Sequence, residues 1–97
     1  MERILCAAIW YIDYERPAHR PINTPGGVVL CGHRHGHIMG QFIALTGKTM
    51  HEAGENIQGF LTDKNRFINR KEAAKMWIEQ GNKLEYSTEE LFSEDLY

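Results

Sequence analysis

The chain contains only two cysteines and three prolines in 97 residues, and neither sign of charge dominates. Two cysteines, Cys6 and Cys31, do not make a disulfide framework, which excludes the small disulfide-rich secreted class and favours a reducing, cytoplasmic setting. Eleven basic residues against thirteen acidic ones exclude a protein that grips long nucleic acid by neutralising many phosphates. A small anionic ligand stays open, because it needs only a local basic cluster.

Long hydrophobic runs are also missing. The longest run, residues 4–12, is too short to span a bilayer and is followed at once by Asp13, so neither a membrane segment nor a secretory signal is expected. A hydrophobic fraction of 42% excludes a disordered chain. We expect one domain over residues 1–97 whose modest core makes self-association a natural way to bury more surface.

Polar side chains are concentrated between Cys31 and His37, where three of the five histidines, an arginine and a cysteine fall within seven residues. An apolar stretch at 27–30 precedes this cluster and predicts a short buried strand. Helical spacing of apolar residues over 36–46, closed by Gly47, predicts a helix after it. The cluster is therefore expected at a strand-to-helix turn, a place where ligands are commonly held.

The rest of the chain predicts further strands and connecting loops. Residues 3–14 are apolar enough for a strand buried on both faces, with a helix as the competing interpretation. All three prolines lie in 16–27, which must be a loop; a solvated connector is favoured over a flap covering a ligand. Residues 48–56 read as irregular. Residues 57–62 and 66–68 flank turn formers and predict a hairpin, in which alternation puts Phe60, unusually, on the polar face with Gln58 and Thr62.

The last third predicts a second helix and an acidic tail. Asn69 and Glu72 have the spacing of a capping box, so a helix is expected over 70–80, closed by Gly81. Its apolar stripe toward the core is Ala73, Ala74, Trp77 and Ile78. The acidic tail at 85–97 is expected to form a short helix from Ser87 or Thr88, docked on this domain or on a neighbouring subunit. The predicted fold class is α+β, a small antiparallel sheet with two main helices.

The histidine cluster fits two chemistries. Cys31, His33, His35 and His37 alternate along the chain and form a zinc-competent set, but the adjacent glycines turn the chain and no second ligand group is spaced to complete a site. Anion binding needs fewer assumptions, because the first amides of the helix point at the same turn. A second basic group surrounds the next helix start: Lys64, Arg66, Arg70 and Lys71. Two basic helix starts suit a ligand with more than one phosphate, and no cofactor or metal is predicted.

Three segments resemble those of small phage proteins that counter the Thoeris anti-phage defence. They are residues 2–11, residues 29–37 with Gly-His-Arg-His-Gly, and residues 58–74 with Gly-Phe-Leu-Thr, Arg-Phe and Arg-Lys-Glu-Ala. The resemblance implies a sponge that sequesters cyclic ADP-ribose isomers made by bacterial TIR-domain enzymes, in the cytoplasm of the infected cell. It also implies dimers assembled into hexamers, and in some members additional sites for cyclic oligonucleotides.

The prediction is therefore capture of a small cyclic nucleotide without turnover, by a homo-oligomer that is a dimer or a trimer of dimers. Arginines and helix amides are expected on the pyrophosphate, Phe60 against adenine and Asn65 or Asn69 on a ribose hydroxyl. The full predicted ligand-binding set is Arg20, His33, Arg34, His35, Phe60, Thr62, Asn65, Arg66, Asn69 and Arg70. The alternatives are a metal-dependent hydrolase using His33, His35 and His37, and a protein that acts purely by binding a host protein.

Overall fold

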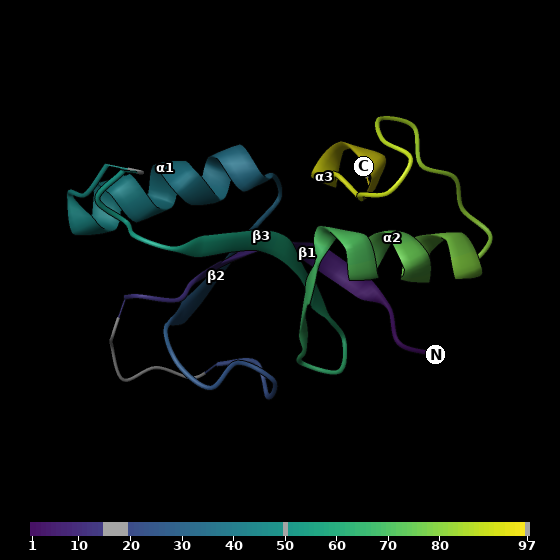
Figure 1. Ribbon diagram of the computed structural model, residues 1–97, viewed down its shortest axis with the longest axis horizontal. Helices are drawn as coiled ribbons and strands as arrows, with labels where there is room; N and C mark the ends of the chain where they lie inside the picture. Colours follow the sequence, from purple (N-terminus) through teal and green to yellow (C-terminus); the bar gives the residue numbers. More distant parts are fainter. Residues whose placement is uncertain (15–19, 50, 97) are drawn as a thin grey trace.

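The computed structural model describes residues 1–14, 20–49 and 51–96, which form a four-stranded antiparallel sheet with helices packed on one face (Figure 1). In chain order the elements are β1 (Ile4–Tyr11), β2 (Val28–Gly32), α1 (His35–Thr46), β3 (Asn56–Thr62), β4 (Phe67–Asn69), α2 (Arg70–Glu79) and α3 (Ser93–Leu96). The strand order is β2-β1-β3-β4, with every neighbouring pair antiparallel. The predicted α+β class is confirmed.

The strand interpretation of the N-terminal run is correct, because β1 is paired on both sides. Ala8 lies opposite Cys31 of β2 and opposite Gly59 of β3. A strand in the middle of a sheet needs apolar side chains on both faces if both are covered, which is why alternation is weak here. Ala7, Ala8 and Ile9 are all fully buried.

The core lies between the sheet and the helices. The rings of Tyr11 and Phe42 stack with centroids 4.0 Å apart, joining β1 to α1. Ile38, Phe60 and Leu91 complete the contact between α1, β3 and the tail, and all three are fully buried. The hairpin face predicted to be polar is thus the face that the helices cover: Phe60 and Thr62 are buried on it, and Gln58 lies at its margin.

The β3–β4 hairpin brings two backbones unusually close. A Cβ at Gly59 would lie 2.1 Å from the carbonyl oxygen of Ile68, so only glycine fits there. The turn closes through Asn65, a non-glycine residue at φ 57, whose N–H donates to Thr62 O at 3.0 Å. Asparagine tolerates this left-handed conformation better than most residues.

The predicted helix α2 is confirmed together with its capping box. Asn69 accepts from the Glu72 N–H at 2.8 Å, and Glu72 accepts from the Asn69 N–H at 2.9 Å. Ala73 and Ala74 are buried as predicted, but Ile78 is 52% exposed, so its place in the core stripe was wrong. Met76 and Trp77 are half-buried and pack against the core, whereas Ile78, the next residue, lies on the exposed side of the helix.

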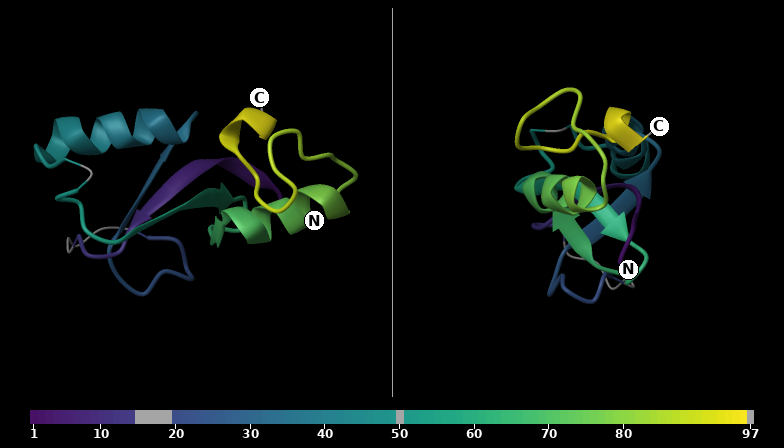
Figure 2. Two further views of the ribbon diagram at one scale, coloured as in Figure 1. Left: turned by 45° about the horizontal axis from the view of Figure 1, so that its top comes forward. Right: turned by 90° about the vertical axis from the view of Figure 1, so that its right-hand side faces the viewer.

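The tail departs most from prediction. No helix begins at Ser87 or Thr88; instead the Ser87 hydroxyl accepts from the amides of Glu89 and Glu90, both at 3.2 Å, and the turn stops there. It cannot continue as a helix because the next amide, that of Leu91, donates to Arg70 O at 3.0 Å. The tail therefore docks on its own chain, and its short helix α3 lies between α1 and α2 (Figures 1 and 2).

Residues 20–27 of the proline-rich loop lie over the other face of the sheet. His19 and the rest of 15–19 fall outside the described residues. Hydrogen bonds hold residues 20–27 in place, one of them from the Ile22 N–H to Asn65 O at 2.8 Å. The Asn23 amide brackets the backbone of Phe67 with bonds of 2.6 and 2.8 Å, and the Trp10 indole N–H donates to Gly26 O at 2.8 Å. This part of the loop is a packed connector, and its hydrogen bonds replace the ladder that prolines cannot make.

Candidate functional site

The histidine cluster lies at the predicted strand-to-helix turn. β2 ends at Gly32, and α1 begins at His35 after an extended Arg34. No side chain caps this helix start, and its first turn contains no acidic residue. The positive end of the helix dipole is thus not offset by a carboxylate of the helix itself.

His35 is a buried residue that links the start of α1 to the sheet through hydrogen bonds. Its Nε2 lies 2.8 Å from Gly59 O, and because a carbonyl can only accept, Nε2 carries the hydrogen. Nδ1 is then an acceptor and lies 3.4 Å from Nη2 of Arg70. Burial lowers the pKa of His35, which agrees with a neutral ring between a carbonyl and a guanidinium.

Arg70 opens α2 and reaches back toward the start of α1. Its Nη2 also donates to Gln58 Oε1, and its guanidinium lies 4.4 Å from the centre of the Phe92 ring. Its Nη1 is buried and has no hydrogen-bond partner among the described residues. Burial lowers the pKa of Arg70, while Glu90 and Glu94 act in the opposite direction. An N–H of a buried cation without an acceptor is costly and marks a place where an anionic group would fit.

The two predicted basic motifs therefore meet within one chain. Arg34 from the first motif donates to Ser93 O, and Arg70 from the second contacts Phe92, the preceding residue. We call Arg34, His35 and Arg70 the arginine junction. A groove of about 380 Å³ runs beside the junction and is lined by Asn56, Ile57, Gln58, Asn69, Arg70, Lys71 and Glu90.

The structure does not gather the histidines around one point. His35 is turned into the core, whereas the rings of His33 and His37 lie together, with centroids 6.2 Å apart. Among residues 1–14, 20–49 and 51–96, no group of three or more His, Cys, Asp or Glu side chains is arranged to hold a metal ion. In this part of the chain, His33, His35 and His37 therefore do not form a common metal site.

Arg66 and Thr62 are engaged elsewhere. Both Arg66 Nε and Nη2 lie 2.8 Å from the Glu2 carboxylate, and the Thr62 hydroxyl donates to the same group at 2.6 Å. The side-chain hydrogen bond from Arg66, followed by that from Thr62, lowers the pKa of Glu2 to about 2. Glu2 was not predicted to take part; the antiparallel β1–β3 pairing, with Ile4 opposite Thr62, brings it there.

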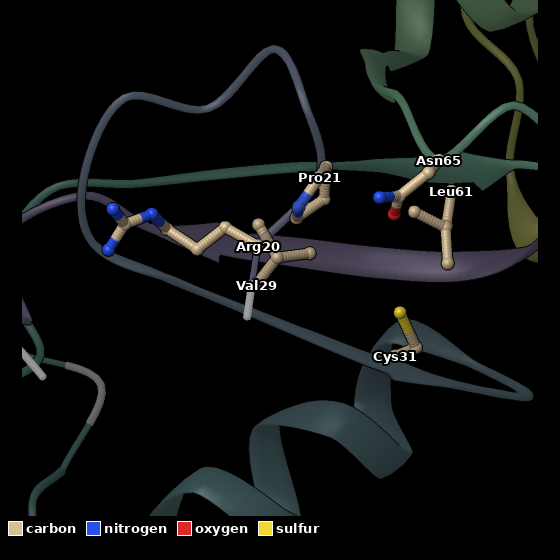
Figure 3. A pocket seen from close by; sticks show the side chains of 6 residues that line it. All are labelled: Arg20, Pro21, Val29, Cys31, Leu61 and Asn65. Atoms are coloured by element: carbon tan, nitrogen blue, oxygen red, sulfur yellow. The ribbon is translucent and has the colours of Figure 1, made fainter. Parts of the chain in front are cut away.

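Arg20 and Asn65 lie on the opposite face of the sheet from His35 and Arg70. They line a pocket of about 270 Å³ together with Pro21, Val29, Cys31 and Leu61 (Figure 3). The Arg20 guanidinium points away from Cys31 and Asn65 in this view. Both cysteines are free, and the hydrogen bond between their thiols lowers the pKa of Cys6 to about 7 and raises that of Cys31.

The structure does not bring the ten predicted residues together. Arg34, His35, Asn69 and Arg70 lie at or beside the junction, and His33 lies at the outer side of the same turn. Thr62 and Arg66 contact Glu2, and Arg20 and Asn65 line the pocket on the opposite face of the sheet. Phe60 is fully buried with its ring 5.2 Å from the centre of the His35 ring, so it is a core residue and presents no surface to adenine. No sequence pattern pointed to Phe92, because its position depends on where the tail docks.

No described helix has the length and apolar character needed to cross a bilayer. Comparison with curated proteins and with solved structures finds no match. Comparison with protein families finds one that covers nearly the whole chain, with residues 3–97 matching the family described as phage T4 y16D protein. The chain therefore belongs to this family of phage proteins.

Proposed function

We propose that this phage protein binds a small cyclic nucleotide of the ADP-ribose type and holds it intact, which withdraws the signal from a bacterial defence such as Thoeris. The proposal places capture in the cytoplasm of the infected cell. Its two sources are independent: the resemblance of residues 29–37 and 58–74 to anti-defence proteins, and the contact between those two motifs at the arginine junction.

The buried Nη1 of Arg70 is the observation that carries the proposal. A guanidinium at a helix start, with one N–H lacking an acceptor, suits a phosphate oxygen, because charge-assisted bonds of this kind are the strong ones. The groove beside it has room for a small ligand, and Asn69, Lys71 and Gln58 supply further polar contacts. Arg34, at the uncapped start of α1, would take the second phosphate.

Capture without turnover is supported by the kind of groups present at the junction. Two guanidiniums, a neutral imidazole and side-chain amides donate hydrogen bonds but supply no activated nucleophile. The imidazole of His35 uses Nε2 for Gly59 and Nδ1 for Arg70, so acting as a base would require breaking the contact that holds Arg70.

Self-association is part of the proposal and is supported by the outer side of α1. The helix contains no Lys, Arg, Asp or Glu over its 12 residues, and Ile43 and Leu45 are exposed on it. At Gly36 and Gly40 an added Cβ would meet nothing within 4 Å, so no contact within the chain requires glycine there. Exposed apolar side chains beside small residues suit close packing against a second copy.

The test is recovery of intact ligand. The purified protein is incubated with cyclic ADP-ribose isomers, separated from free nucleotide by gel filtration and heat-denatured, and the released material is identified by mass spectrometry. We expect unmodified ligand at a fixed molar ratio to protein. R34A and R70K should each weaken capture by roughly tenfold or more, since each loses a charge-assisted or forked contact.

K75A is the matched control, because Lys75 is an exposed cation on α2 away from the junction. It should leave capture unchanged. Release of degraded nucleotide would show that the protein is an enzyme and would refute capture without turnover. Absence of capture of every isomer, together with a host protein retained on immobilised phage protein, would favour a pure interaction protein.

A further inference from the structure

The acidic tail lies against both arginines of the arginine junction. After the Ser87 turn the chain crosses the start of α2, and α3 ends between α1 and α2, above the sheet (Figures 1 and 2). Glu90 forms part of the wall of the groove beside Arg70 and Lys71. The tail is thus a cover over the site and also one of its sides.

Three consecutive residues make the contact. The Leu91 side chain is fully buried, and its amide donates to Arg70 O at 3.0 Å. Phe92 places its ring against the Arg70 guanidinium, and Ser93, also buried, offers its carbonyl to Arg34. Each arginine of the junction is therefore engaged by the tail through a different chemical group, a π face for one and a carbonyl dipole for the other.

Charge follows the same pattern. The carboxylates of Glu90 and Glu94 both favour the charged form of Arg70, and Glu94 favours the charged form of His35. Neither carboxylate forms an ion pair with Arg70 among the described residues. The tail thus offers negative charge near the guanidinium but leaves Nη1 without an acceptor.

We propose that residues 90–94 are an intramolecular stand-in for the ligand, held over the arginine junction until a ligand with two phosphates displaces them. The inference rests on the proposed function and explains how the site would select ligands with two phosphates. An anion with a single phosphate group would gain too little to displace two carboxylates, an aromatic ring and a carbonyl. A pyrophosphate supplies both the charge and the acceptors that the tail lacks. When no ligand is bound, acidic groups and an aromatic ring lie against the junction and keep out unrelated anions with one phosphate group.

The experiment combines affinity with amide hydrogen exchange in the full chain. Inorganic pyrophosphate and cyclic ADP-ribose are the probes, and inorganic phosphate is the comparison with one phosphate group. The amides followed are those of Leu91, Phe92 and Asp95. These amides donate to Arg70 O, to the Asp95 carboxylate and to Phe92 O in the docked tail. We expect pyrophosphate to accelerate their exchange and phosphate to leave it unchanged.

The paired variants are E90Q/E94Q and E79Q/E85Q, which remove the same charge at different places. Glu79 and Glu85 are exposed and are not among the charges acting on Arg70. E90Q/E94Q should bind pyrophosphate roughly threefold to tenfold more tightly, and E79Q/E85Q should change affinity by less than about twofold.

Each outcome separates the two proposals. Binding of cyclic ADP-ribose with no change in tail exchange would overturn the stand-in and leave nucleotide capture in place. If pyrophosphate releases the tail but no cyclic ADP-ribose isomer binds, the stand-in role of the tail would be supported and nucleotide capture would be refuted. Equal gains in affinity from the two double variants would show that the tail acts only through general surface charge, which would refute the stand-in role. If neither probe has any effect, both the stand-in role and nucleotide capture would be refuted.

Discussion

The helices α1 and α2 both begin at a basic motif, yet they are built in opposite ways. α2 closes its own start with the Asn69–Glu72 capping box and has charged residues along its exposed side. α1 has no capping side chain, no acidic residue in its first turn and no Lys, Arg, Asp or Glu anywhere in its length. One helix satisfies its own polar groups in water, and the other depends on groups from elsewhere.

The difference shows which helix is fixed by local sequence and which by its surroundings. The start of α1 is held by the His35 bond to Gly59 and by the Arg34 bond to the tail, both of which link residues distant in sequence. Its exposed side has glycines that its own fold does not need. The start of α1 therefore depends on contacts between residues distant in sequence, whereas the start of α2 is fixed by its own capping box.

The largest expected effect is at the anchor of α1. H35A removes the bond to Gly59, leaves a buried carbonyl unpaired and opens a space beside Phe60. The free energy of unfolding, measured by urea denaturation, should fall by roughly 2–4 kcal/mol. H37A, on the exposed side of the same turn, should stay within about 0.5 kcal/mol of the wild type. A loss below about 1 kcal/mol in H35A would mean that the anchor is elsewhere.

A second effect concerns pH. Burial lowers the pKa of His35 from its ordinary value of 6.5, so the folded state favours the neutral ring. The stabilisation is complete above pH 6.5 and is lost as the pH falls from there through the folded pKa, because the unfolded chain takes up the proton first. The slope cannot exceed about 1.4 kcal/mol per pH unit for one group. Denaturation of H35Q between pH 7 and 5 should show a flatter profile than that of H37Q; equal slopes would contradict the assignment.

The third prediction tests the self-contained start of α2. N69A removes the acceptor of the Glu72 amide and should cost about 1 kcal/mol in thermal or urea unfolding. N69D keeps an acceptor in the same place and should lose much less. If both variants are equally destabilised, the contribution of Asn69 comes from the groove it lines and not from the cap.

The smallest expected effect is an increase in stability from a substitution at Gly40. In G40A the new Cβ meets nothing within 4 Å, so the unfolding free energy of the dilute monomer should rise by roughly 0.5–1 kcal/mol. Analytical ultracentrifugation of the same variant should show weaker self-association if α1 packs closely on a second copy. A stabilised variant with unchanged association would remove Gly40 from any subunit contact.

Much of the fold could be read from local pattern. The capping box, the hairpin turn and the end of α1, where Gly47 at φ 72 donates to Ile43 O at 2.8 Å, depend on residues within a few positions of one another. His35 and Arg70, one from each predicted basic helix start, are also in contact, whereas a shared ligand site stays a prediction. The individual roles were less predictable. Arg66 was chosen as a basic residue near a helix start, but Glu2 holds it through a contact 64 positions apart.

By itself the sequence determined the α+β class, the element boundaries within a few residues and the two basic motifs, because propensity, alternation and capping act over short distances. Only the tertiary structure decided which face of the hairpin is buried, where the acidic tail docks and which of the predicted binding residues meet. Those outcomes depend on the strand order β2-β1-β3-β4 and on packing of the tail between two helices. Such contacts join residues tens of positions apart, and no local pattern encodes them.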